Sequence, residues 1–451
     1  MSGRWAEASA LARAILARAP ANPDVEFAAL QVGCWAEFKG GGKPAARVLY
    51  AAHAAAVRRL ATSDVANPGS LRGALDAAIL TDDLEAVRAL FAKIFRPPWQ
   101  GIDVAVSPQM TMVDCARATG ATLSTIEPAR TEADAHARWN YVAEPTYALN
   151  VSNAEILLGW DFVLAPNGAV LEDSGYLPLT MTHAAFPHYA GVDHVVHPWQ
   201  PVAIEVDADV LVMTAPADQF IGHWIIDFLP RLRARAIHPT TKLVLPADLP
   251  QKLQDLLTYF GITADQVLTL PRGQRYRFRS ACVVHTGDPH RPSAATVRYV
   301  SEALRRLPQP GRMRRRLHLL RDTAARRIVN RSEAAAVLTR WGFEETRLAD
   351  LSIAAQRDAL SDAEIVIATY GSDLLANLFM PPGSHLVELN YDPARLDAGC
   401  APRSAFLGIH HHLLACARAE ASIAVGQCKD SDFSVDCSVL EGLLRDILGT
   451  P

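Results

Sequence analysis

The sequence predicts an α/β protein in which two Rossmann-like domains face a cleft, preceded by an all-α module of helical-repeat type. Short apolar strands alternate with helical patterns between residues 210 and 285, and again between residues 317 and 389. Such alternation is typical of parallel sheets covered by helices on both faces. Leu307-Pro308-Gln309-Pro310-Gly311 separates the two alternations and is a candidate linker. The predicted domains are therefore residues 1–97, 98–307 and 308–451.

The first 97 residues carry helical periodicity. The first predicted helix ends at Pro20-Ala21-Asn22-Pro23, and further helices run through Val48–Leu60 and Leu71–Phe95. The ending LARAPANPD resembles the close of a tetratricopeptide unit, where proline follows the second helix. We therefore predict a degenerate tetratricopeptide-like module that ends near Phe95-Arg96-Pro97-Pro98. A generic helical bundle is the alternative.

From Ile102 to Val206 the pattern is irregular and strand-rich, as in the segment around the turn Pro166-Asn167-Gly168. Several histidines fall close together here, and their spacing matches no metal-ligand motif. They are His183, His188, His194 and His197. The sequence therefore gives no basis for a metal site in this region.

Composition narrows the classes of protein to consider. A net charge of −4 gives no basis for nucleic-acid binding. The seven cysteines are scattered without a CxxC pair, so neither a zinc site nor a disulfide framework is predicted. The N-terminus lacks the apolar core of a signal peptide, and no apolar run approaches the roughly 18 residues of a membrane span. We expect a cytoplasmic protein, with the helical module contacting a protein partner or, peripherally, the inner face of the membrane. The oligomeric state stays open.

The first candidate site lies in the segment FIGHWIIDFLPR, residues 220–231. Helical spacing places His223, Asp227 and Arg231 on one stripe of an apolar helix predicted over residues 223–236. A buried polar stripe is unfavourable unless its members are paired or used in chemistry. The stripe therefore indicates either a structural ion pair or a general base, Asp227 or His223, that removes a proton from an attacking hydroxyl. Pro230 is expected to kink or restart the helix.

The second candidate site is an arginine-rich loop. Arg321 comes at the carboxyl end of the predicted strand Leu317–Leu320, and Arg326, Arg327 and Asn330 follow before the next helix. Guanidinium groups there could clamp a diphosphate without a metal ion. The alternative is that these arginines are solvated on a loop.

The third candidate site follows the predicted strand Ile365–Ala368, in the turn Tyr370-Gly371-Ser372-Asp373. Gly371 permits a tight turn, and a helix expected from Asp373 would offer free backbone N–H groups to a phosphate. Asp373 could bind a ribose or sugar hydroxyl, or it could be a plain helix cap. Glu388, near another carboxyl end, is suited to hydroxyl binding. Ligands of such sheets bind beyond the carboxyl ends of the strands. Since the order of strand, glycine and helix suits an anionic ligand, we predict a phosphate-bearing substrate.

Four segments, in this order, resemble glycosyltransferase family 61: FIGHWIIDFLPRL, LLRDTAARRIVNRSE, WGFEETRLADLSIAAQ and ATYGSDLLANLFMPPGSHLVEL. The resemblance covers roughly residues 205–395 and leaves out the helical module. The family includes bacterial capsule- and lipopolysaccharide-type enzymes, plant xylan transferases and animal O-linked N-acetylglucosaminyltransferases. The resemblance implies a GT-B fold, an inverting mechanism, a nucleotide-sugar donor held mainly by the second domain, and a glycan acceptor.

The resemblance also implies roles for the candidate residues. Asp227 or His223 is the expected base, and Arg231 lies on the acceptor side. The residues expected to bind the donor are Arg321, Arg327, Asn330, Tyr370, Gly371, Ser372, Asp373, Asn377 and Glu388. No cofactor and no metal ion is expected, since the Asp-x-Asp pairs at residues 207–209 and 430–432 do not stand where metal-dependent transferases carry theirs.

Two departures from the family pattern qualify this expectation. Tyr370 and Asp373 stand where the family's commonest motif has the histidine and the last glycine of histidine-glycine-alanine-glycine. They indicate a different donor sugar or a weakened site. Two rival functions therefore stay open: a non-catalytic sugar- or nucleotide-binding protein of the same fold, and a GT-B-like enzyme of another kind, such as a nucleotide-sugar epimerase.

Overall fold

The computed structural model describes residues 2–18, 20, 22–62, 68–94, 103–133, 139–158, 162–171, 189–190, 194–199, 202–214, 219–305, 315–321, 326–391, 400–419 and 431–450. Contacts group the chain into two compact units. Unit 1 holds residues 1–121, 151–207 and 271–281, and unit 2 holds residues 122–150, 208–270 and 282–451. Both predicted domain boundaries lie outside the described residues, as do His183 and His188 and the side chains of His194 and His197. The predicted division into three domains stays a prediction.

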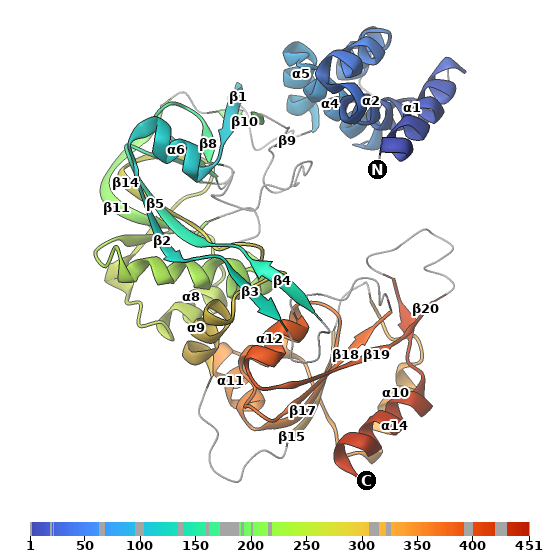
Figure 1. Cartoon of the computed structure of the whole chain (residues 1–451), viewed down its shortest axis with the longest axis vertical. Coiled ribbons are helices and arrows are strands. Elements are labelled where there is room, and N and C mark those ends of the chain that lie inside the picture. The colour runs from blue at the N-terminus through green and yellow to red at the C-terminus, as the bar shows by residue number, and fades with distance from the viewer. Residues whose placement is uncertain are drawn as a thin grey trace. The chain divides into compact units, whose positions relative to one another are not determined.

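The N-terminal part of unit 1 is helical, as predicted (Figure 1). Its helices are α1 (Ser2–Ala17), α2 (Pro23–Ala51), α3 (Ala54–Thr62), α4 (Pro68–Thr81) and α5 (Leu84–Ile94). They enclose an apolar core in which Leu30, Leu75 and Ile79 are fully buried. The side chain of Asn22 caps α2 by accepting a hydrogen bond from Asp24 N, which explains the predicted break before Pro23.

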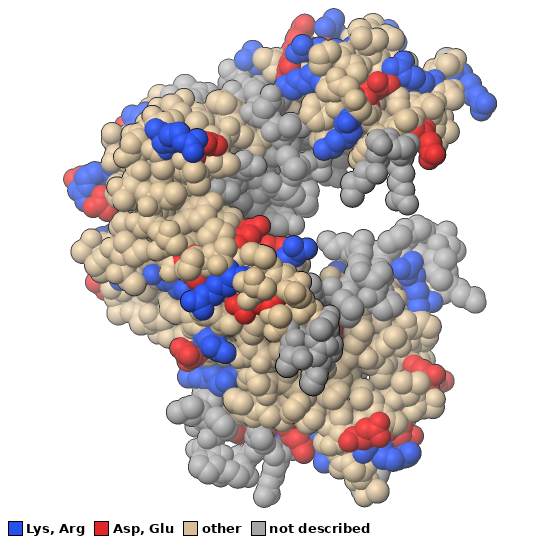
Figure 2. All heavy atoms as spheres, in the orientation of Figure 1, with Lys and Arg blue, Asp and Glu red and all other residues tan. Residues whose placement is uncertain are grey.

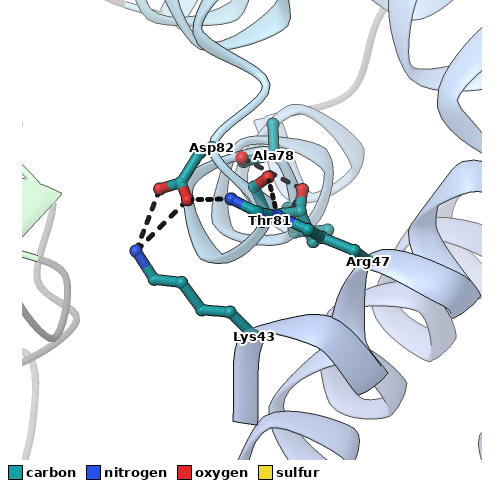
Figure 3. A network of polar contacts seen from close by, with 6 residues as sticks. Lys43, Arg47, Ala78, Thr81 and Asp82 are labelled. Atoms are coloured by element: carbon teal, nitrogen blue, oxygen red, sulfur yellow. Dashed lines mark hydrogen bonds and ion pairs between the residues drawn. The ribbon is translucent and has the colours of Figure 1, made fainter.

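Charged side chains of both signs are interspersed on the face of this helical part that Figure 2 shows. A group of charged side chains fixes the turn between α4 and α5, which interrupts the helical pattern of Leu71–Phe95. Asp82 adopts a left-handed conformation there, with φ of 61°. Its carboxylate accepts from Lys43 Nζ at 3.0 Å and from Arg47 Nη2 at 2.5 Å, as Figure 3 shows. These two cations of α2 therefore hold the α4–α5 turn in place.

The rest of unit 1 is strand-rich, as predicted. Its strands pair in the order β6 (Glu155–Leu158), β7 (Phe162–Leu164), β8 (Val170–Leu171), β1 (Asp103–Met110), β10 (His194–Trp199) and β9 (Tyr189–Ala190). The turn Pro166-Asn167-Gly168 joins β7 to β8, with Gly168 N donating to Ala165 O at 2.8 Å, so this prediction is confirmed. The sequence did not predict the short helix α6 (Met112–Thr119), whose first turn is capped by the Thr111 side chain.

Unit 2 contains the two predicted alternations of strand and helix. In the first, β11 (Ile204–Val212), β12 (Lys242–Pro246) and β13 (Val267–Leu270) are parallel, and α8 (Gln251–Thr258) follows β12. The helix predicted over residues 223–236 is three consecutive pieces: α7 (Ile221–His223), the π-helical η2 (Trp224–Phe228) and the 3₁₀ helix η3 (Leu229–Ala236). Pro230 lies in the first turn of η3, so the expected restart at this proline is confirmed.

The second alternation forms a parallel sheet in the order β16 (Glu344–Thr346), β15 (Arg315–Leu319), β17 (Ala363–Thr369), β18 (His385–Asn390) and β19 (His410–Ala415). Helices α10 (Arg331–Arg340) and α14 (Cys437–Leu448) share one core cluster with this sheet. Helices α11 (Ile353–Ser361) and α12 (Cys400–Phe406) share another, so the sheet is covered on both faces (Figure 1).

The core cluster that contains α11 and α12 also includes Leu211, Trp224 and Leu245 of the first alternation. These residues belong to the same cluster as Leu317 and Val366 of the second alternation. The two alternations are thus packed around a common apolar interior. The predicted α/β class, the helical N-terminal region and the parallel sheets are confirmed. Among the described helices, none combines the length and apolar character needed to cross a membrane.

Candidate functional site

The strand order of the second sheet defines where a ligand should bind. From β15 the chain moves through α10 to β16 on one side, and then through α11 to β17 on the other side of β15. The carboxyl ends of β15 and β17 therefore flank a topological switch point, the usual ligand site of open α/β sheets. Arg321 follows β15, and the turn Tyr370–Asp373 follows β17. Two of the predicted sites are thus brought together by the topology.

A cleft of about 230 Å³ lies at these carboxyl ends. The first alternation contributes Ile221, Ile225 and Lys252 to its wall. The second contributes Leu320, Arg321, Leu348, Ala349, Gln356, Leu360, Ser372, Asp373, Leu375, Ala376 and Phe379. The wall is therefore largely apolar, with a few polar groups that converge from several elements, as in binding sites for small molecules.

Arg321 is held against the turn that follows β17. Its Nη1 donates to the carbonyl oxygen of Tyr370 at 3.3 Å, and Nη1 of Arg326 donates to the same oxygen at 3.1 Å. The Arg326 guanidinium also lies over the Tyr370 ring, 5.1 Å from its centroid. Gly371 makes this approach possible, because a Cβ atom at that position would lie 1.9 Å from Arg321 Nη1. The φ of Gly371 is 142°, which also disfavours any side chain.

The segment after Gly371 is the 3₁₀ helix η6 (Ser372–Leu378), where the sequence suggested an ordinary helix from Asp373. Its N-cap is Gly371 and has no side-chain cap, so Asp373 is not the plain helix cap considered as the alternative. Asp373 instead lines the cleft. Burial raises the pKa of its carboxyl group, and the nearby Arg321 guanidinium opposes that rise. A carboxyl group placed beside an arginine suits binding of a sugar hydroxyl next to an anion.

Sequence reasoning missed two polar residues of the cleft wall, Lys252 and Gln356. Lys252 Nζ donates to the carbonyl oxygens of Leu348 and Ala349, both at 3.1 Å, and burial lowers its pKa. Gln356 Nε2 donates to Leu348 O at 2.5 Å and to Leu351 O at 3.3 Å. The only signal for Lys252 was its place on the helix after β12, at a carboxyl end, because no motif marks it.

The His223–Asp227–Arg231 stripe separates into two parts. His223 Nδ1 lies 2.6 Å from Asp227 Oδ2, with 37% of the histidine side chain and 15% of the aspartate side chain exposed. Arg231 is buried and donates to the carbonyl oxygens of Val212 at 3.2 Å and of Asp227 at 3.2 Å. Arg231 thus ties η3 to the end of β11 through backbone carbonyl oxygens.

The histidine–aspartate pair lies on a helix that touches the cleft. Ile221 and Ile225 of that helix line the cleft, whereas His223 and Asp227 are not among the lining residues. A Cβ atom on Gly222 would lie 3.1 Å from the Cβ of Ser372, so the helix packs closely on the turn that carries Asp373. The π-helical turn between His223 and Leu229, of a kind frequent at functional sites, was not predicted from the sequence.

Several expected donor residues have other partners. The Arg327 side chain forms an ion pair with Asp432 at 2.7 Å. The Asn330 side chain exchanges two hydrogen bonds with the backbone of Val435, at 2.9 and 3.0 Å. Asn377 is fully buried and donates to Ser404 Oγ, and Glu388 is paired with His411. None of these four is among the residues that the structure describes as lining the cleft.

Residues 221–387 match the family model described as Glycosyltransferase 61. The match begins at α7 and ends within β18, so it includes the histidine–aspartate pair, the arginine-rich loop and the turn after β17. This match supports the assignment of the chain as a glycosyltransferase. A search among curated proteins found no match for the chain.

Proposed function

We propose that the chain is an inverting, metal-independent glycosyltransferase of GT-B layout. It transfers a sugar from a nucleoside-diphosphate sugar to a hydroxyl of a glycan, in bacterial polysaccharide or lipopolysaccharide biosynthesis. The observation that carries the proposal is the meeting of Arg321 and Asp373 in a cleft at the switch point of the matched segment. Arg321 supplies a fixed cation for the diphosphate, and Asp373 supplies an acceptor for a sugar hydroxyl.

The same geometry supports an assignment of the base. In the tautomer with its proton on Nδ1, His223 donates to Asp227 Oδ2 at 2.6 Å and carries its basic lone pair on Nε2. The acceptor oxygen attacks the anomeric carbon on the face opposite the diphosphate. The new C–O bond forms as the bond to the phosphate oxygen breaks, the diphosphate keeps that electron pair, and the hydroxyl proton passes to His223. Arg321 stabilises the charge that develops on the diphosphate. His223 is thus the base, and Asp227 orients it.

The departure at position 370 has a physical explanation under this proposal. The contact to Arg321 and Arg326 comes from the Tyr370 carbonyl oxygen, which any residue at this position would supply. The tyrosine ring adds a surface for Arg326. Replacing the family's histidine by tyrosine therefore leaves the arginine arrangement intact.

A thermal-shift panel of nucleoside diphosphates and their sugars tests donor binding. We expect one nucleotide to raise the melting temperature with increasing concentration, because a ligand that binds only the folded state stabilises it by mass action. The matching sugar donor is then used in transfer assays with glycan acceptors. His223→Ala and Asp227→Asn should lose transfer while keeping the thermal shift. Wild-type transfer rates in both Asp227→Asn and Arg321→Ala would contradict the assignment.

A non-catalytic sugar- or nucleotide-binding protein is the second candidate function. Asp373 favours it, because a carboxylate in the cleft partly neutralises Arg321 in the absence of donor. Calorimetry that detects donor binding, without hydrolysis or transfer for any acceptor, would support this second candidate.

A further inference from the structure

A second group of reactive side chains lies on the face of the second sheet that α12 covers. His411 of β19 is opposite Leu386 of β18 in the parallel register, and Glu388 is two residues further along the same face of β18. Cys400 is the first residue of α12 and packs in the core cluster that includes Leu386. Three different elements therefore bring a carboxylate, a thiol and an imidazole to one place.

The three side chains are close enough to share one ion. One ligand atom from each residue lies within 4.8 Å of the other two. His411 Nε2 is 3.0 Å from Glu388 Oε2. Around a tetrahedral zinc ion, bond lengths to nitrogen, oxygen and sulfur imply separations of about 3.4–3.6 Å between ligand atoms. Small rotations of the side chains would reach these separations.

Burial gives this group an electrostatic reason to hold a cation. The Glu388 side chain is 1% exposed and the His411 side chain is 10% exposed, and Cys400 is fully buried. A buried carboxylate is unfavourable without a compensating positive charge. A carboxylate and a thiolate carry two negative charges, so a divalent cation with a neutral imidazole makes the buried group neutral.

Glu388 has a neighbouring hydrogen-bond donor in addition to His411. Asn390 Nδ2 donates to Glu388 Oε1 at 2.8 Å and so fixes the orientation of the carboxylate. Hydrogen bonds of this kind commonly position carboxylates that bind metals. The combination of sulfur, nitrogen and oxygen ligands suits zinc better than the oxygen-preferring magnesium or calcium.

We propose that Glu388, Cys400 and His411 form a zinc site that braces α12 against β18 and β19. None of the three lines the cleft, and the proposal does not depend on the proposed function. Binding converts the Cys400 thiol to a thiolate and releases its proton to solvent, while zinc gains a bond to sulfur. A solvent molecule takes the fourth position, as in other sites with three protein ligands.

Metal titration of the full chain tests the site. After chelator treatment, the wild-type protein should bind one equivalent of zinc, and its melting temperature should rise by several degrees. Cobalt should replace zinc and produce the near-ultraviolet charge-transfer band of a thiolate–cobalt bond. Cys400→Ser should abolish that band, and His411→Gln should weaken zinc binding by at least tenfold.

Matched controls separate this site from other thiols and imidazoles. Cys416→Ser and His412→Gln change neighbouring residues of the same segment that lie outside the cluster, so both should keep the band and the zinc equivalent. If Cys400→Ser does not fold, the cobalt spectrum of the wild type and of Cys416→Ser still reports a thiolate ligand. Wild-type protein without a zinc equivalent or a thermal shift would overturn the proposal, as would loss of the band in Cys416→Ser.

Discussion

Arg326 and Arg327 are neighbours in the chain, yet they belong to two different regions of unit 2. Arg326 faces the switch-point turn, where it binds the Tyr370 carbonyl oxygen together with Arg321. Arg327 faces the C-terminal segment and pairs with Asp432. We call the contacts between residues 327–330 and 432–435 the C-terminal clasp. Its backbone is joined by hydrogen bonds from Phe433 N to Arg327 O at 2.9 Å and from Val329 N to Phe433 O at 2.8 Å.

The difference arises from one backbone conformation. Arg326 has a φ of 61°, which is unusual for a residue with a side chain, and it turns the chain between the two regions. Charge alone therefore does not assign a role to an arginine within this loop. We expect the arginines on the cleft side to determine donor binding and transfer. We expect the C-terminal clasp to determine the free energy of unfolding.

Gly371→Ala should have the broadest effect, because it changes both donor binding and the stability of the turn after β17. The added Cβ would overlap Arg321 Nη1 and would force that guanidinium away from the turn. We expect donor binding and kcat/KM to fall by on the order of 100-fold, with a loss of about 1–3 kcal/mol in the free energy of unfolding. Transfer kinetics and urea unfolding measure the two effects.

Gly383→Ala is the matched control for that variant. Gly383 also has a positive φ, 84°, but no atom lies within 4 Å of its added Cβ. It should lower stability without changing donor affinity. Equal losses of affinity in the two variants would mean that backbone strain, and not displacement of Arg321, weakens binding.

Arg321→Ala should lower kcat/KM by about 10²–10³-fold, as expected for loss of a group that stabilises developing charge. Arg321→Lys should recover only part of this, since lysine lacks the planar guanidinium fork. Arg327→Ala should leave the rate of transfer unchanged, because the guanidinium of Arg327 donates to Asp432 and not to the cleft. Steady-state kinetics of the three variants check the comparison, and a comparable loss in Arg327→Ala would remove the distinction between the two regions.

His318 of β15 makes the free energy of unfolding depend on pH. Burial lowers its pKa to about 4, and the opposing charge of Glu345, whose Oε1 is 3.8 Å from Nδ1, only partly offsets this effect. An unfolded histidine has a pKa of about 6.5. As pH falls, the unfolded chain therefore gains the proton first, and stability complete above about pH 6.5 is lost progressively toward the folded pKa of about 4.

His318→Leu should remove this component, roughly 3 kcal/mol of the loss in unfolding free energy between neutral pH and the folded pKa. Urea unfolding at a series of pH values measures it, with nucleotide affinity at neutral pH as the control. An unchanged pH dependence would mean that the pKa of His318 is the same in the folded and unfolded chains.

Asn330→Ala should have the smallest effect and should fall on stability alone. It removes both side-chain hydrogen bonds to the Val435 backbone, so we expect a loss of about 1–2 kcal/mol in unfolding free energy, with transfer retained. Asn330→Asp keeps the acceptor for Val435 N and should lose less. Faster hydrogen exchange at the Val435 amide would localise the change. A drop in donor affinity would instead restore the donor role that the family resemblance implies for Asn330.

Local patterns predicted most of the elements that build the cleft. The apolar runs that became β15, β17 and β18 were recognised to within a few residues, and the carboxyl-end rule brought Arg321, Ser372 and Asp373 together. The partners of Arg327 and Asn330 were not foreseen, because residues 432–435 lie about a hundred positions away and carry no local signal. Strand β19 and helices α12 and α14 follow the last predicted strand and were not predicted, although α14 carries a local helix signal in its Asp436 N-cap.

The interrupted chain path of unit 2 bears on how this protein folds. Its sequence enters the unit at residue 122, leaves after residue 150, returns at residue 208, leaves again after residue 270 and returns at residue 282. Glu127 lies in the first of these three segments. Its carboxylate accepts from Arg233 of the second segment at 2.7 Å and from Ser293 of the third segment at 2.8 Å. Contacts between such distant positions slow folding, since long loops must close before they form. During synthesis, the strand that carries Glu127 cannot form these contacts until Arg233 and Ser293 have been synthesised. A fragment that starts at residue 221, where the family match starts, would leave Arg233 without its buried carboxylate and should not fold.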